Sequence, residues 1–205
     1  MKDGRRRALA TVATVVLLPC LAACERLAEL AGKPTFHSTD ITGAEFARRL
    51  DMPDADGRMR SLADWKGKVT VVFFGYTHCP DVCPTTMAEL AELRKSLGAE
   101  GDRLQTVFVT IDPERDTPEL LQAYVGNFGP GVTALRGSAE QTAAAAKEFK
   151  VFFQKVPGKT PGSYTMDHSA ASFVFDAAGK VRLYVPYGGD PKGFAADVRQ
   201  LVAAA

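Results

Sequence analysis

The chain has 205 residues, of which 46% are hydrophobic and 24% charged, and its formal net charge is +1. This length and composition are those of one globular domain. The near-neutral charge, without a basic patch in the sequence, excludes nucleic acid as a partner.

The first residues have the pattern of a secretory signal. Lys2 and three arginines at positions 5–7 precede an apolar run, 8–23, which is too short and too rich in Ala for a secure membrane span. The run ends in LAAC, which resembles the bacterial lipobox and implies cleavage before Cys24 and lipidation of that cysteine. We expect residues 1–23 to be a lipoprotein signal peptide, with an uncleaved N-terminal anchor as the alternative. Either form would hold the protein at the membrane, on the periplasmic side of a bacterial cell envelope.

The rest of the chain divides into a linker and a domain. Residues 24–34 read as a lipidated N-terminus with a short polar linker, and residues 35–205 as the folded domain. From 36 to 65 the pattern is weak, but Asp56-Gly57 lies between two short segments as a hairpin turn would. We expect a small β-rich extension there.

A cysteine pair follows the strongest strand signal. Residues 69–74 are β-branched or aromatic with almost no polar interruption, which predicts a central strand buried on both faces. Cys79 and Cys83 come next, and Pro84 suits the first turn of a helix that Gly98 ends. The apolar stripe of this helix is formed by Met87, Leu90, Leu93 and Leu97.

The position and spacing of these cysteines favour chemistry over packing. A helix N-terminus favours thiolate over thiol, and thiolates bind metals or attack disulfides. The Cys-x-x-x-Cys spacing is one residue wider than the redox Cys-x-x-Cys, and two thiolates on one helical turn can hold one ion at i and i+4. The alternatives are a structural disulfide or two buried cysteines acting as small hydrophobes. Closing so short a loop gains little entropy, and Pro80, Asp81 and Pro84 make a poor core segment.

Periodicity and capping residues predict the remaining elements. Residues 155–163 contain two Pro-Gly pairs without periodicity, which indicates a loop. We expect strands at 104–112, 132–135, 171–175 and 181–185, and helices at 117–128, 138–149 and from 190 onward. This order is typical of an α/β protein with a thioredoxin-like sheet flanked by helices, in which ligands gather beyond the strand C-termini. Cys79, Cys83, Asp112 and His168 would then lie at one end of the sheet.

One of three histidines is the best candidate for a third ligand. His37 lies in the weakly patterned extension and reads as a surface residue, whereas His78 adjoins Cys79 and can point away from it or tune the thiolates. His168 precedes a strand at the place where thioredoxins carry a proline facing the cysteines, and here no proline is present. Its imidazole can reach a metal held by the cysteines, with Asp167 or a backbone carbonyl orienting the other ring nitrogen.

Three ordered motifs resemble one family. FGYTHCPDVCP at 74–84, IDPERDTPE at 111–119 and DHS at 167–169 are similar to the signatures of the Sco/SenC family. The resemblance runs from about Asp56 to the C-terminus. It implies a thioredoxin-like fold, one copper ion held by Cys79, Cys83 and His168, and a role in building the CuA centre of cytochrome c oxidase. Some family members are held at the membrane by a transmembrane helix, and the lipobox of this chain differs from that mode of attachment.

Two functions remain open. In the first, the chain is a copper metallochaperone that delivers Cu(I) or Cu(II) to oxidase subunit II, since three ligands leave the ion open to an incoming thiolate. Zinc would also fit these ligands. In the second, the chain is a thiol–disulfide oxidoreductase that keeps the target cysteines reduced, with Cys79 attacking and Cys83 resolving. Other copper chaperones or thioredoxin-like reductases would then be further partners.

His168 decides between these readings, because a reductase needs no third ligand. We therefore expect delivery, which is not an enzymatic activity, to be the main role. A peroxidase of the same fold class would need one activated cysteine near Thr77 or Arg115 and has no use for the second cysteine, so it ranks last.

Overall fold

The fold is built on β4, Val69–Gly75, in which all seven residues are buried. In the computed structural model, which describes residues 35–205, β4 pairs in parallel with β5, Leu104–Thr110, and antiparallel with β9, Ala171–Phe175. The prediction of a central strand covered on both faces is therefore confirmed. The full sheet has the order β1-β10-β9-β4-β5-β6. Its remaining strands are β1 (Thr39–Asp40), β6 (Val132–Leu135) and β10 (Val181–Pro186).

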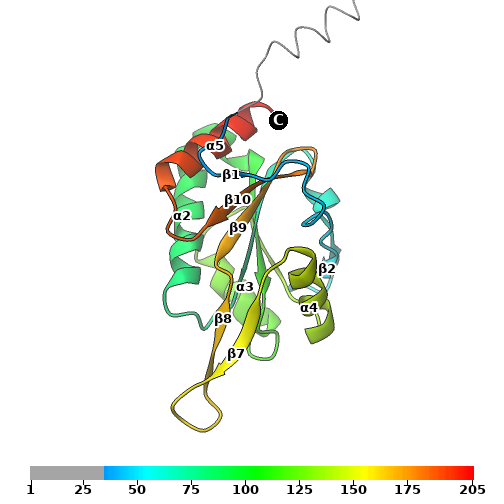
Figure 1. The fold of residues 1–205 in the computed structure, drawn as a ribbon, viewed down its shortest axis with the longest axis vertical. Helices are drawn as coiled ribbons and strands as arrows, with labels where there is room; N and C mark the ends of the chain where they lie inside the picture. Colours follow the sequence, from blue (N-terminus) through cyan, green and yellow to red (C-terminus); the bar gives the residue numbers. More distant parts are fainter. Residues whose placement is uncertain (1–34) are drawn as a thin grey trace, which may run out of the picture. The chain divides into compact units, whose positions relative to one another are not determined.

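Helices cover both faces of this sheet. Successive strand residues point to opposite faces, so Phe73 lies near Leu90 and Phe194, whereas the Phe74 ring packs on Phe149 at 5.1 Å between centroids. Figure 1 shows the same division, with α2 and α5 on one side of the sheet and α4 on the other. The four α-helices of the described region are α2 (Val82–Ser96), α3 (Pro118–Gly126), α4 (Ala139–Glu148) and α5 (Pro191–Ala203), and short 3-10 helices span Leu62–Trp65 and Gly98–Arg103.

The N-terminal part of the described region, where we expected a β-rich extension, contains three two-residue strands. β2, Met52–Pro53, and β3, Met59–Arg60, form a hairpin, and β1 extends the main sheet. The turn contains Gly57 at φ +81°, a conformation that glycine adopts without strain. The Asp56-Gly57 turn is thus confirmed.

The loop predicted at 155–163 is wrong over part of its length. Phe153–Pro157 forms β7, which pairs antiparallel with β8, Tyr164–His168, so only 158–163 is loop. Most side chains of this hairpin are exposed or half-buried. The two strands are held together mainly by hydrogen bonds between their backbones, and they bury no continuous apolar face. Their sequence therefore lacks the alternation of apolar and polar residues that predicts a strand. Figure 1 shows the hairpin projecting from the sheet.

No helix within residues 35–205 has the length and hydropathy that crossing a bilayer requires. The predicted signal peptide and Cys24 lie outside the described residues.

Candidate metal centre

The cysteine loop joins β4 to α2. Cys83 is buried in the first turn of α2, and Cys79 lies half-buried in the loop before that helix begins. The expectation that both cysteines stand on one helical turn is therefore wrong, because Val82 is the first helical residue. The Cys83 backbone N–H instead donates to Cys79 Sγ at 3.4 Å. A free N–H of the helix N-terminus thus still stabilises negative charge on Cys79, as the sequence predicted.

His168 is the last residue of β8 and faces the cysteines. Its Nε2 atom lies 3.7 Å from Cys83 Sγ, and its Nδ1 atom lies 3.2 Å from the Ser169 carbonyl oxygen. A proton on Nδ1 is donated to that carbonyl, which leaves the Nε2 lone pair directed toward the thiols. The backbone carbonyl, and not the exposed Asp167, is the orienting group. The rings of Phe73 and Tyr76 meet the imidazole edge-on and restrict its rotation.

The three predicted residues meet in space. One ligand atom each from Cys79, Cys83 and His168 lies within 4.8 Å of the other two. They come from two elements 85 residues apart in sequence, the cysteine loop and the β7–β8 hairpin. Two sulfurs and one imidazole nitrogen are a donor set that fits copper, and with zinc they would leave a fourth position open.

The two thiols have opposite acidities. Hydrogen bonding from Cys83 lowers the pKa of Cys79 to about 3, and the same bond together with burial raises the pKa of Cys83. The metal-free pair therefore holds one negative charge near neutral pH, on the more accessible sulfur. Binding a metal through both sulfurs releases the Cys83 proton, because thiolate is the metal ligand.

Asp116 holds the cysteine loop in place. Its carboxylate is fully buried and accepts hydrogen bonds from the Thr77 N–H, from the Thr77 hydroxyl at 2.6 Å and from the Thr110 hydroxyl at 2.5 Å. His78 is turned toward these groups, with Nδ1 3.0 Å from Thr77 Oγ1. His78 is therefore not a member of the metal-binding group. His37 is exposed, as predicted, and its backbone N–H donates to Asp197.

A second network holds the strand that carries His168. Asp112 is buried and accepts from Arg115 Nε at 2.5 Å and from the Tyr164 hydroxyl at 2.8 Å. Arg115 also donates to the Tyr164 carbonyl oxygen, and its guanidinium lies 3.6 Å from the centroid of the Tyr164 ring. Asp112 lies at the expected end of the sheet but acts on β8 rather than as a ligand. Thr77 and Arg115, the residues that a peroxidase would use, are both engaged in these networks.

Gly75 allows Cys83 to approach the end of β4. A Cβ atom at this position would lie 2.9 Å from Cys83 Sγ and from the rings of Phe73 and Phe108. The missing side chain thus leaves room for the buried thiol. Neither Gly75 nor Asp116 was singled out from the sequence, because their roles depend on which side chains the fold brings together.

Comparison with known proteins gives the family. The sequence matches the SCO1/SenC family over residues 38–203. The chain belongs to the SCO1/SenC family. The SCO2-like protein of Rickettsia felis is 32% identical over 165 residues, covering 80% of this chain and 78% of the relative. A mitochondrial SCO2 homolog of Bos taurus is 35% identical over 153 residues, and the aligned part covers 74% of this chain and 58% of the bovine protein.

Solved SCO1/SenC structures share the fold. Bradyrhizobium japonicum ScoI, solved with copper bound, has a TM-score of 0.67 and 36% identity, covering 75% of this chain and 97% of that one. The apo Sco1 protein of Thermus thermophilus has a TM-score of 0.69 and 34% identity, covering 85% and 99%. The thioredoxin-like α/β fold expected from the sequence is confirmed.

Proposed function

We propose that this SCO1/SenC protein binds one copper ion through Cys79, Cys83 and His168 and delivers it to the CuA centre of cytochrome c oxidase subunit II. The observation that carries the proposal is the approach of three ligand atoms, two sulfur and one nitrogen, to within 4.8 Å. Two related structures, Bradyrhizobium japonicum ScoI and yeast Sco1, were solved with copper bound. Soft sulfur donors favour Cu(I), and a fourth ligand would accommodate Cu(II).

The arrangement suits transfer better than permanent storage. Cys79 is accessible, whereas Cys83 is buried, so an incoming thiolate of the acceptor can bind the ion beside Cys79. Each new bond from copper to an acceptor sulfur replaces one to this chain, and the oxidation state of copper does not change. The ligand exchange therefore needs no added electron donor.

We also propose that the protein is attached to a membrane, through residues outside the described part of the chain. Lipidation at Cys24 would attach the protein to the periplasmic face of a membrane, with 24–34 as a linker. A related structure from Bacillus anthracis, at 26% identity and a TM-score of 0.63, is a SCO1/SenC family lipoprotein. Intact-mass analysis of the purified protein would show a lipidated chain that begins at Cys24, and an unmodified chain would reject this part of the proposal.

A thiol–disulfide oxidoreductase is the second candidate. The observation in its favour is the pairing of a half-buried thiolate, Cys79, with a buried thiol, Cys83. Cys79 would attack a disulfide in the target and form a mixed disulfide. Cys83 would then lose its proton and displace the second target thiol, which leaves a disulfide in this chain. A thioredoxin-like reductase would have to restore the dithiol.

His168 separates the two functions in the cell. In a strain that carries only the His168→Ala protein under limiting copper, we expect loss of CuA-containing oxidase, because the two sulfurs alone do not define a stable site for Cu(II). Thiol chemistry should persist with both cysteines intact. Normal oxidase assembly in this strain, with copper binding abolished in the purified variant, would reject delivery and leave the reductase function.

A further inference from the structure

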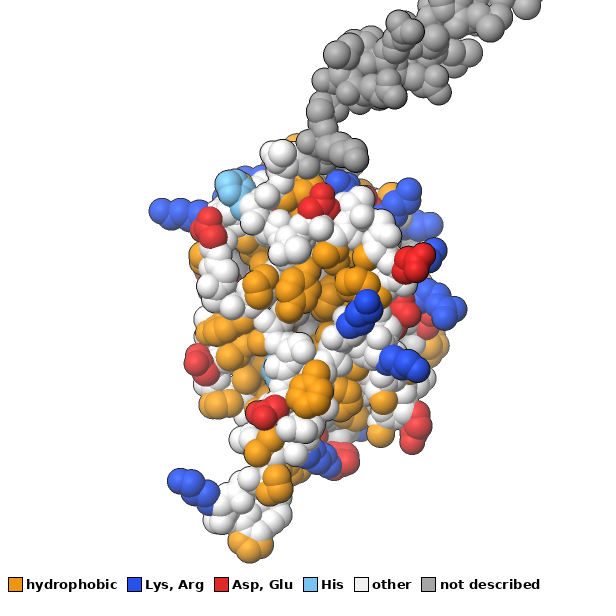
Figure 2. All heavy atoms as spheres, viewed as in Figure 1, with side chains coloured by type: hydrophobic (Ala, Val, Ile, Leu, Met, Phe, Trp, Pro, Cys, Tyr) orange, Lys and Arg blue, Asp and Glu red, His pale blue; other side chains and the backbone are white. Residues whose placement is uncertain are grey.

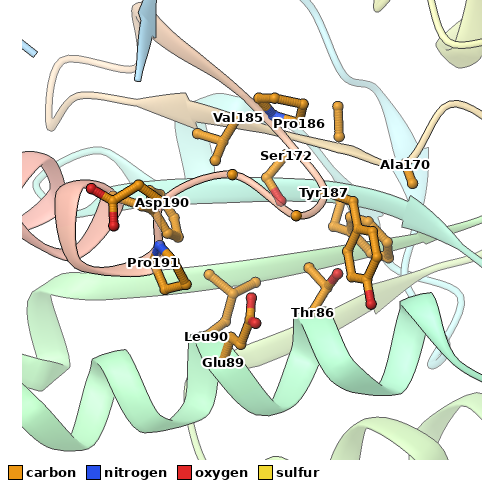
Figure 3. Close-up of a pocket in the computed structure, with 15 residues that line it drawn as sticks. Thr86, Glu89, Leu90, Ala170, Ser172, Val185, Pro186, Tyr187, Asp190 and Pro191 are labelled. Carbon is orange, nitrogen blue, oxygen red and sulfur yellow. The ribbon is translucent and has the colours of Figure 1, made fainter. Parts of the chain in front are cut away.

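A pocket lies directly beside the metal centre. It has a volume of about 160 Å³ and opens between α2 and the 187–190 loop that joins β10 to α5 (Figure 3). Phe73 forms part of its wall and also contacts the imidazole of His168, with 6.2 Å between the ring centroids. Thr86 lies about one turn of α2 beyond Cys83 and also lines the pocket. A side chain of another protein bound in this pocket would therefore hold that protein next to the metal ligands.

Two hydroxyl groups that face this pocket have no hydrogen-bond partner in the described part of the chain. Thr86 is 8% exposed and Ser172 is 5% exposed, and neither side chain makes a hydrogen bond to another described residue. Figure 3 shows the Thr86 side chain entering the pocket from α2 and the Ser172 side chain entering it from β9. Each hydroxyl has free lone pairs, and both hydroxyls face the pocket. The pocket thus offers hydrogen-bond acceptors to an incoming donor.

The charged residues that line the pocket are both acidic. Glu89 of α2 lines it and is exposed to solvent, and its side chain forms no ion pair or hydrogen bond within residues 35–205. Asp190 adds a second carboxylate, whose Oδ1 atom accepts from the Lys192 N–H. No Lys, Arg or His is among the residues that form the pocket. Leu90 and Phe194 supply apolar wall.

The surface around the pocket is apolar. On the face that carries β9 and β10, hydrophobic side chains gather in the middle and most charged ones lie toward the margin (Figure 2). Tyr187 and Phe152 are 42% and 57% exposed. Their backbones bond to Ala170 and Ser169, the residues that follow His168. Exposed aromatic side chains beside a functional centre are typical of a protein-binding surface.

We propose that this pocket receives a Lys or Arg side chain of the protein that takes copper from Cys79, Cys83 and His168. The inference rests on the proposed function. The aliphatic stem of such a side chain packs on Phe73 and Leu90, and its charged head donates to the hydroxyls of Thr86 and Ser172 and pairs with Glu89. Anchoring this side chain places the acceptor's thiolates over the open side of the metal, and the carboxylates speed the encounter with a basic partner.

The binding chemistry is tested first with small probes. Nα-acetyl-lysine amide and its neutral counterpart Nα-acetyl-norleucine amide are titrated into the ¹⁵N-labelled full chain in detergent micelles. We expect saturable shifts of the Thr86 and Ser172 amide signals with the lysine probe, with affinity at least about fivefold above that of the norleucine probe and reduced about as much by Glu89→Gln. Equal affinity for the two probes, no saturable shift, or an unchanged Glu89→Gln affinity would overturn the proposal.

The role of the pocket is tested by copper transfer to the CuA-bearing domain of subunit II. Glu89→Gln should slow transfer by roughly fivefold or more at low salt, and the difference should shrink as salt rises. The matched control is Glu92→Gln, since Glu92 is also exposed on α2 but pairs with Lys95 and does not line the pocket. Equal rates for Glu89→Gln and wild type would overturn the inference. Absence of transfer by the wild type would reject the proposed function, and the probe titration would still decide whether the pocket binds a cation.

Discussion

A carboxylate outside the ligand set helps to position the metal centre. Asp116 is fully buried, yet its carboxylate accepts hydrogen bonds from Thr77 and Thr110. It thereby joins the cysteine loop to the end of β5. Buried carboxylates are tolerated only with such partners, so the hydrogen bonds also define where the loop lies. The metal ligands are thus positioned by a polar network and not by the apolar core alone.

The Cys79 thiolate gives a residue-scale prediction. Because the pKa of Cys79 is lowered to about 3, its thiolate persists as pH falls. Alkylation of the reduced, metal-free protein by iodoacetamide should therefore change little between about pH 8 and about pH 5, whereas an ordinary cysteine loses reactivity over that range. The rate is measured by mass spectrometry of the Cys79 peptide.

The same experiment has an internal control. Cys83→Ala removes the largest cause of the lowered pKa, so the reactivity of Cys79 in this variant should fall steeply as pH decreases. A wild-type rate that drops about tenfold per pH unit across the range would contradict the assignment of the thiolate to Cys79.

At the scale of elements, the apolar pattern of the sequence predicted the elements that form the core. It did not predict the exposed hairpin or the polar networks. The strands β4, β5 and β9 and the four α-helices follow from apolar runs, caps and prolines, which report burial directly. The β7–β8 hairpin could not be predicted, since its side chains are mostly exposed. The meeting of His168 with the cysteines could be predicted from topology, because strand ends gather at one edge. The networks of Asp112 and Asp116 depend on side-chain directions that the sequence pattern does not contain.

The attachment of the hairpin to the sheet gives an element-scale prediction. Tyr164→Phe removes the hydroxyl that donates to buried Asp112 and so loosens β8, the strand that ends in His168. We expect faster hydrogen exchange of the β7–β8 amides, by roughly tenfold, since a hydrogen bond to a charged group contributes about 1.5–3 kcal/mol. Copper should also bind more weakly.

The control for this prediction is Tyr187→Phe. The Tyr187 side chain is exposed and makes no side-chain hydrogen bond within the described residues. Its substitution should leave exchange in the hairpin unchanged. Unchanged exchange in Tyr164→Phe as well would show that the Tyr164–Asp112 bond does not hold the strand.

At the scale of the whole molecule, one short segment positions both elements that carry the metal ligands. The segment that follows β5 contributes Asp116, which holds the cysteine loop, and Asp112 with Arg115, which hold the β8 strand. Both ligand-bearing elements are therefore aligned by one stretch of five residues, 112–116. This explains in physical terms why the IDPERDTPE motif accompanies the cysteines and the histidine, although it supplies no ligand.

Direct transfer of copper tests the central claim. The full chain loaded with Cu(I) is mixed with the reduced, metal-free CuA-bearing domain of subunit II, and native mass spectrometry reads the copper content and the disulfides of both proteins. We predict that copper moves to the acceptor, that thiols on both sides stay reduced, and that His168→Ala carries and transfers none. The contrary result would be copper that stays on the wild-type chain, while the metal-free chain reduces a disulfide in the oxidised acceptor and becomes oxidised itself.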